Sequence, residues 1–182
     1  MKWVKQSIHY WCPDTKEHKF LGQNVTVAIL DTGISPHPDF KDRILSFRDF
    51  SSTTGSSEKV LFSFSHFSPL IDNSGHGTHV AGILAGSGLL SSGTYAGIAP
   101  FCNLIIGKVL DQNGNGSIKN VINGIQWIRD IYTQFHIRII NISVGTRPDL
   151  SIHQKLLLLN AVESLWDLGL VVVCLLYTSD AA

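Results

Sequence analysis

Strands of the fully buried type are the feature of this sequence that most restricts its fold. The clearest is 25–30 (VTVAIL), which is continuously apolar, rich in β-branched residues and followed by the Asp-Thr-Gly turn. A run of this kind without apolar/polar alternation is typical of a buried strand. Three further strands are predicted at 103–110, 138–142 and from 170 to 173.

Helical patterns occupy the stretches between these predicted strands. Residues 76–86 carry small side chains on a helical repeat, for which we expect close packing on several sides. Ser117 is a predicted N-cap, and a further helix is predicted over 151–167 with Gly169 just past its end. The alternation of strand and helix predicts an α/β fold with a doubly wound, mostly parallel sheet and helices on both faces.

Composition limits the classes of partner. The 182 residues are 44% hydrophobic and 15% charged, which is enough apolar material for one globular domain with a core. Lys plus Arg and Asp plus Glu each number 14, so the formal net charge is zero. This balance predicts neither a nucleic-acid partner nor an anionic membrane partner.

Targeting signals and cysteines bear on the compartment. The first residues lack the apolar region of a signal peptide, and the most apolar stretch, 168–177, is too short to span a bilayer. Cys12, Cys102 and Cys174 are odd in number and have no C-x-x-C spacing, so we expect free thiols. Together these features favour a cytoplasmic protein and leave secretion open.

Asp31 follows the first predicted strand directly and is held by an Asp-Thr-Gly turn. In open parallel sheets the ligand crevice lies beyond the carboxyl ends of the strands. The loop 111–116 and the segment 143–145 also follow predicted strands, so we expect all three to converge on one rim. A carboxylate fixed in this way can orient another group, although Asp-Thr-Gly alone also fits an ordinary turn.

The heptapeptide H-G-T-H-V-A-G at 76–82 begins a predicted helix with His76. The positive end of the helix dipole disfavours an imidazolium there, so His76 needs an acidic partner to act as a general base. We expect Gly75 and Gly77 to leave room for a substrate backbone, and His79, one turn further on, to be structural.

These two segments resemble the first two signatures of the subtilisin-like serine proteases (subtilases, peptidase family S8), in that family's order of Asp before His. The similarity runs from about Gly22 to Val173 and continues through the following segments: 97–100, 108–110, 114–117, 123–125 and 141–145. The resemblance implies an N-terminal extension at 1–21, a partial catalytic domain at 22–174 and a non-native tail at 175–182.

Roles for individual residues follow from the resemblance. His76 would be the general base, and Asp31 would orient its ring and stabilise the imidazolium. Two further sets of residues would lie on either side of an extended polypeptide substrate and pair with its backbone: Gly114, Asn115 and Gly116, and Ser143, Val144 and Gly145.

The resemblance also bears on calcium. Asp39 matches a position that binds structural calcium in many relatives, whereas the chemistry itself requires no cofactor. The loop 87–95, which would supply the other ligands, contains no acidic residue and no Asn. A calcium ion at Asp39 would therefore depend on carbonyl and hydroxyl oxygens.

The end of the sequence departs from the family pattern. The strand at 171–174 does not continue into a Gly-Asn segment, and no G-T-S motif supplies a nucleophile. Ser179 lacks the flanking glycine and the following helix. The resemblance thus implies serine endopeptidase activity through an Asp-His-Ser triad in a full-length protein. This chain, with the C-terminal part of the domain missing, is expected to be inactive and prone to aggregate at an exposed sheet edge.

Three other interpretations were weighed. An aspartic protease needs two carboxylates that share a proton, and only one Asp-Thr-Gly is present. A metallohydrolase would use His76, His79, Asp31 and Asp72, but the spacing is not that of H-E-x-x-H. A non-catalytic peptide-binding fragment, or pseudoprotease, remains the alternative to the protease.

Overall fold

The fold is built on one parallel sheet. The computed structural model describes residues 2–8, 10, 20–51, 72–145 and 150–174. Its sheet has five strands in the order β2-β3-β1-β4-β5, and every neighbouring pair is parallel. The strands are β1 Thr26–Asp31, β2 Ile44–Asp49, β3 Asn103–Lys108, β4 Ile137–Ile142 and β5 Val171–Cys174. The predicted parallel α/β fold is confirmed, while Cys12, Ser179 and the tail 175–182 lie outside the described residues.

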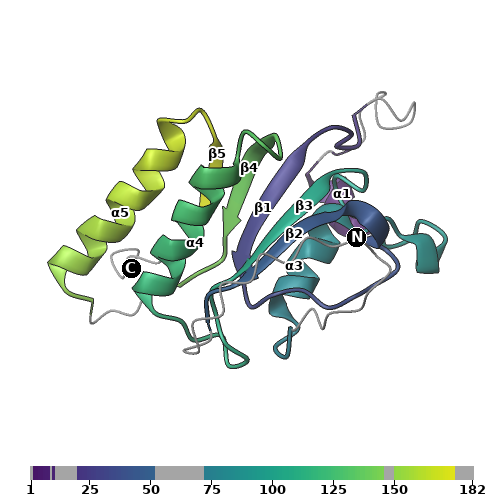
Figure 1. The fold of residues 1–182 in the computed structure, drawn as a ribbon. Helices are drawn as coiled ribbons and strands as arrows, with labels where there is room; N and C mark the ends of the chain where they lie inside the picture. The colour runs from purple at the N-terminus through teal and green to yellow at the C-terminus, as the bar shows by residue number, and fades with distance from the viewer. Residues whose placement is uncertain (1, 9, 11–19, 52–71, 146–149, 175–182) are drawn as a thin grey trace.

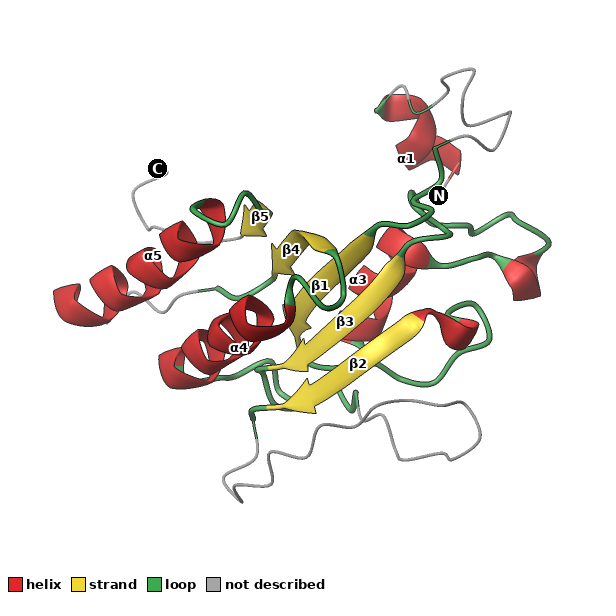
Figure 2. Ribbon diagram, turned by 45° about the horizontal axis from the view of Figure 1, so that its top comes forward, coloured by secondary structure: helices red, strands yellow, loops and turns green. Residues whose placement is uncertain are grey.

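Helices cover both faces of this sheet, as Figures 1 and 2 show. The main helices are α3 His76–Ala85 on one face and α4 Ile118–Ile131 and α5 Ile152–Trp166 on the other. Shorter ones are α1 Lys2–Ser7 and the 3₁₀ turns Lys41–Arg43 and Leu89–Ser91. Alternate residues of β1 serve the two layers: Val27 and Ile29 pack in the α3 layer, and Ala28 and Leu30 pack in the other. Within the described ranges, no helix has the length and apolarity that a membrane crossing requires.

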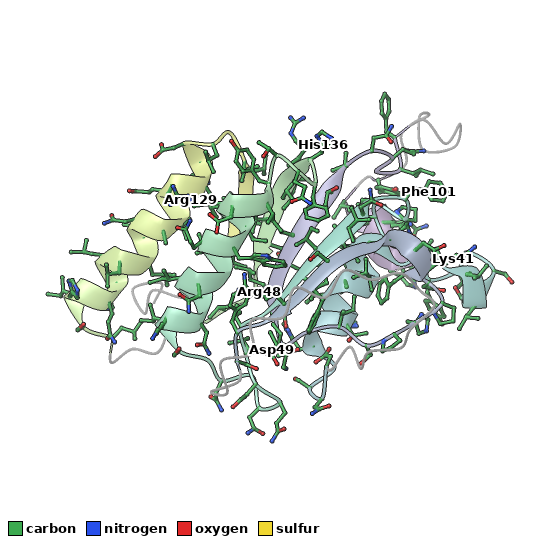
Figure 3. All side chains as sticks on the ribbon, viewed as in Figure 1. Lys41, Arg48, Asp49, Phe101, Arg129 and His136 are labelled. Carbon is green, nitrogen blue, oxygen red and sulfur yellow. The ribbon has the colours of Figure 1, made fainter. Side chains whose placement is uncertain are left out.

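Strand β2 is an addition to the four predicted strands. Its sequence ILSFRD mixes apolar with polar and charged residues, and only three of its six positions are buried. Among the described strands it lies at one edge of the sheet and pairs with β3 alone, with a shift in register between Ile44 and Ser46. Figure 3 allows it to be followed from Lys41, just before the strand, to Asp49 at its end. An edge strand of this kind lacks the continuous apolar run by which the other strands were found.

The ends of α4 and α5 agree with the sequence signals. The Ser117 side chain accepts a hydrogen bond from the Asn120 amide at the start of α4. Beyond α5, Gly169 has a φ of 74°. The amide of Leu170 donates to the Leu165 carbonyl, as in a Schellman cap. The predicted N-cap of α4 and the predicted glycine after α5 are therefore confirmed.

The small-residue helix α3 differs from the prediction. We expected close packing on several sides, but only the face formed by Gly77, Ala81 and Ala85 is buried. A Cβ added at Gly82 would meet no atom within 4 Å, and Ile83 is 41% exposed. The small residues on the buried face allow α3 to lie close to the sheet. Packing against the described residues does not explain the small residue Gly82.

Candidate active site

Asp31 and His76, which are 45 residues apart in the sequence, meet at the carboxyl end of β1. Asp31 is the last residue of β1 and is fully buried, whereas His76 is the first residue of α3 and its side chain is 55% exposed. The Nδ1 atom of His76 lies 2.8 Å from Oδ1 of Asp31. Because an ionised carboxylate can only accept, this contact places the ring proton on Nδ1 and leaves Nε2 as an acceptor on an accessible ring.

The Asp31 carboxylate is held by its own turn as well as by His76. The Thr32 amide donates to Asp31 Oδ1 over 2.6 Å. The Asp31 carbonyl accepts from the amides of Val109 and Leu110, which follow β3. Among the described residues, Asp31 Oδ2 is buried and has no hydrogen-bond partner. One oxygen is therefore fixed firmly toward His76, and the other is buried.

Glycine 77 makes the approach of α3 to β1 possible. A Cβ at Gly77 would lie 2.3 Å from the Gly33 carbonyl oxygen and 3.1 Å from Asp31 Oδ1. We expected Gly77 to leave room for a substrate backbone, and this is corrected: the room is taken by the chain's own Gly33. Gly75 has a φ of 83° with open space around its Cα, so it is needed for its left-handed backbone conformation.

Asp72 caps the start of α3, a role that we did not infer from the sequence. Its carboxylate accepts hydrogen bonds from the amides of Gly75 and Thr78 and from the hydroxyls of Thr32 and Thr78. Burial raises the pKa of this carboxyl group, but the hydrogen bonds from Thr78, Thr32 and Gly75 outweigh it and leave the pKa below its ordinary value. An acidic residue shortly before a predicted helix start was the available signal.

Thr32 joins the Asp72 cap to the Asp31 turn. Its hydroxyl donates to Asp72 and accepts from the Gly77 amide over 2.9 Å. Two of the amides that a helix leaves unpaired at its start, those of Gly77 and Thr78, are thus satisfied by Thr32 and Asp72. This network connects the start of α3 to the end of β1 and so supports the geometry of the Asp31–His76 pair.

Two loops flank the end of β1, because its neighbours in the sheet are β3 and β4. The Asp111 amide donates to the Asn115 carbonyl, and Asp111 Oδ1 accepts from the Asn113 and Asn115 amides, so the loop after β3 is closed on itself. After β4, the Ser143 amide donates to the Leu30 carbonyl. The convergence on one rim is observed. The substrate-binding roles of 114–116 and 143–145 stay predictions.

Asp39 anchors the loop that follows α3. Its carboxylate oxygens accept hydrogen bonds from the amides of Gly88 (3.0 Å) and Leu90 (3.2 Å). Each carboxylate oxygen has a second lone pair, so these bonds do not decide whether a cation binds there. Structural calcium at Asp39 stays a prediction.

The four residues of the metallohydrolase alternative do not form one cluster. Asp72 caps α3, Asp31 binds His76, and His79 is exposed on α3. No group of three or more His, Cys, Asp or Glu side chains that could hold a metal ion occurs in the described part of the chain. The parallel α/β sheet also differs from the all-β fold that the aspartic protease alternative would require.

Two of the cysteines are free thiols, as expected: Cys102 is buried, and Cys174 is half-buried. Burial raises the pKa of the Cys102 thiol to about 11. Because the thiolate is the reactive form, Cys102 is protonated and unreactive near neutral pH.

Comparison with known proteins gives consistent results. The model of the subtilase family matches residues 22–174. Serine protease AprX of Bacillus subtilis (strain 168) is 41% identical over 156 residues, which cover 83% of this chain and 32% of AprX. The major intracellular serine protease of the same organism is 37% identical over 155 residues, covering 84% of this chain and 42% of that protein.

A solved structure shows the same relationship. Sphericase superposes with a TM-score of 0.65 at 27% sequence identity, and the match covers 84% of this chain and 46% of sphericase. The chain thus spans less than half the length of each of these three proteins. Because the family model matches most of the chain and the fold agrees, this protein belongs to the subtilase family.

Proposed function

We propose that this chain supplies the Asp and the His of a serine endopeptidase that cleaves polypeptides, with residues 22–174 as its part of the catalytic domain. In this proposal 1–21 is an extension before that domain, and 175–182 is a tail that does not belong to it. The observation that carries the proposal is the 2.8 Å contact between a fully buried Asp31 and a half-exposed His76.

The chemistry follows from the difference in exposure between the buried Asp31 and the accessible His76. His76 Nε2 would accept the proton of a serine hydroxyl as its oxygen attacks the peptide carbonyl carbon, and would later donate that proton to the leaving amine. Asp31 would stay ionised, keep the ring proton on Nδ1 and stabilise the imidazolium. A buried carboxylate suits this role because its interaction with the imidazolium is weakly screened by water.

The substrate would lie in the gap that β1 leaves when it ends. Strands β3 and β4 are two strand spacings apart, about 9.5 Å, which is the separation that one extended peptide bridges while pairing on both sides. The amides of Gly114 and Asn115 and the Asn115 carbonyl are already bonded to Asp111, so pairing with the substrate on that side would fall to the Gly114 carbonyl and to Gly116. On the other side the Ser143 amide is bonded to Leu30 and Val144 is buried, so pairing would fall to the Ser143 carbonyl and to Gly145.

The nucleophile is the missing partner in this scheme. Among the described residues, no serine hydroxyl is hydrogen-bonded to His76. Loss of the nucleophile from a triad of this kind lowers turnover by a factor of about 10⁶. We therefore expect the 182-residue chain on its own to be inactive.

The test begins with the source gene, read from the codon of Val171 onward. The product of the continuous reading frame is then assayed on a fluorogenic peptide. Asp31→Asn is expected to lower kcat by about 10⁴-fold, and His76→Ala by about 10⁶-fold. His79→Ala is the matched control, because His79 is an exposed histidine on the same helix. Full hydrolysis by His76→Ala would refute the proposal.

A second function is supported by the position of the loop after β3 and the segment after β4 on either side of the β1 end: binding of extended peptides without cleavage. Fluorescence anisotropy with a labelled extended peptide and the 182-residue chain measures it directly. Saturable binding without cleavage, by a gene product that contains no G-T-S motif, would favour this second function over the protease.

A cytoplasmic location is part of the proposal, and it is supported by the free thiols of Cys102 and Cys174. The relatives do not decide the compartment, because one is described as intracellular and another, from the same organism, as a minor extracellular protease. Fractionation of the source cells with an antibody against this chain would test it. Recovery from the medium alone would contradict it.

A further inference from the structure

Lys108 is a buried cation beside the candidate active site. It is the last residue of β3, is 6% exposed and is the register partner of Asp31 on β1. In-register residues of neighbouring parallel strands point to the same face, so both side chains lie on the α3 side of the sheet, with Ile106 and Ile29 before them. A lysine ammonium is rarely buried to this extent unless its neighbours require it.

The described residues bury three charged side chains, and all three are bonded to Thr32. The Thr32 amide donates to Asp31, its hydroxyl donates to Asp72, and its carbonyl accepts from Lys108 Nζ. Lys108 is thus the one cation of this buried group, and it faces two carboxylates across a single residue. Its ammonium group and the two carboxylates are thus joined through the amide, hydroxyl and carbonyl of one residue.

The hydrogen bonds of Lys108 go to main-chain carbonyls. Its Nζ donates to the carbonyls of Thr32 and Leu110, the latter over 3.1 Å. In the described part of the chain, no carboxylate oxygen lies within salt-bridge distance of Nζ. The two carbonyls belong to the turn after β1 and to the segment that leads into the loop 111–116. Lys108 therefore ties the Asp31 turn to the start of one substrate edge.

We propose that Lys108 is a positioning residue of this site, whose buried ammonium clamps the Thr32 and Leu110 carbonyls and thereby holds the Asp31 carboxylate in contact with His76. Burying an ammonium group is costly, and an apolar side chain of similar length would fill the same space without that cost. The positive charge and the donors are consequently what this position requires. The inference rests on the proposed function only in treating Asp31 and His76 as the catalytic pair.

The experiment observes that pair directly by NMR in the 182-residue chain. With the imidazole protonated, the proton shared between His76 Nδ1 and Asp31 Oδ1 gives a low-field resonance whose exchange with water reports how firmly the contact is held. Lys108→Met, which keeps the side-chain length but removes charge and donors, is expected to accelerate this exchange at least 10-fold, or about 1.4 kcal/mol in the opening equilibrium. Lys108→Gln, an uncharged donor, is a second variant in case the first does not fold.

The matched control is Ile106→Val, on the same strand and face, which is 0% exposed. It weakens the core without touching the clamp, so the exchange rate of the shared proton should stay as in the wild type. Equal exchange in wild type and a folded Lys108 variant would overturn the proposal. So would equal acceleration by Ile106→Val, or a failure of both Lys108 variants to fold, since either would make Lys108 a general stability residue. No step depends on proteolysis, so an inactive protein would leave this result unaffected.

Discussion

Two regions of the sheet are stabilised in different ways. Around the carboxyl end of the central strand β1, polar contacts fix individual atoms: Thr32, Asp72, Gly77 and Thr78 are linked by hydrogen bonds of 2.5–2.9 Å. At the β5 side, contacts are apolar and incomplete, because Val171 and Val173 are 58% and 53% exposed. Directional bonds fix geometry and fail when one partner is lost, whereas apolar packing weakens in proportion to the area removed.

Helix α5 shows this incompleteness most clearly. Leu158, Val162 and Leu165 are buried against the sheet, while Ile152 is 79% exposed and Trp166 is 56% exposed. Helix α3 has one buried face and bears the more demanding hydrogen bonds at its start. If the comparison is right, mutations in α5 should change stability alone, and mutations near α3 should change the geometry of the site as well.

The largest expected effect is on stability at the apolar side. Leu165→Ala removes a fully buried side chain from the core and should lower the free energy of unfolding by about 4 kcal/mol. Leu156→Ala is the matched control on the same helix, because Leu156 is 51% exposed and should cost less than about 1 kcal/mol. Urea unfolding followed by circular dichroism measures both, and equal losses would mean that α5 is not packed as described.

A somewhat smaller effect is expected at Gly77, this time with a change in geometry. Gly77→Ala forces a methyl group into the Gly33 carbonyl, so α3 must move away, at a cost of about 3 kcal/mol. The low-field proton of His76 should disappear with it. Gly82→Ala lies on the same helix with open space, and should be neutral or stabilising by up to about 1 kcal/mol. A retained low-field proton in Gly77→Ala would contradict the close approach.

The ionised Asp72 carboxylate should make the free energy of unfolding depend on pH. Its native pKa is depressed, so its contribution to stability is present above the ordinary carboxyl pKa and is lost as the pH falls through the native value. Asp72→Asn should cost about 2 kcal/mol at neutral pH, because amide donors then face an NH₂ group. The difference from wild type should shrink on acidification. A difference that is constant with pH, measured by urea unfolding, would exclude an ionised cap.

The smallest effect is expected at the end of α5. Gly169 has a φ of 74°, which a residue with a Cβ adopts at a cost of about 1 kcal/mol. Gly169→Ala should therefore lower the melting temperature slightly and leave the His76 proton signal unchanged. Gly169→Asn, which tolerates this conformation better, should lie between the two. A loss of the low-field His76 proton in Gly169→Ala would show that the β5 side of the sheet is coupled to the carboxyl end of β1.

Local patterns were sufficient for much of the fold. The apolar run at 25–30 became β1 Thr26–Asp31 with one residue of difference, and the helix ends at Ser117 and Gly169 were located by residues whose effect is local. The two catalytic candidates came from a heptapeptide and a turn. Each of these signals is contained in a few neighbouring residues, so it can be recognised from the sequence without knowledge of the fold.

Most of the features that were missed depend on partners far away in the sequence. Gly77 is required by the carbonyl of Gly33, and Asp72 is joined to the turn after β1 by Thr32, which lies 40 residues before it. The cap that Asp72 forms on α3 is different, because its bonds to Gly75 and Thr78 are local. Strand β2 is recognisable only once β3 is beside it. Nothing near Lys108 in the sequence indicates that its ammonium group binds the turn after β1. Contacts of this kind are fixed by the packing of the sheet and have no local signature.

The central position of β1 has a consequence for the order of folding. β1 ends at Asp31, and its two neighbours in the sheet follow it in the sequence, beginning only at Asn103 and Ile137. The buried, mostly apolar β1 must therefore wait for both before its edges are paired, and contacts between such distant segments form slowly. On a ribosome, β1 would emerge long before it could be enclosed, which makes it the segment most in need of protection by a chaperone during synthesis.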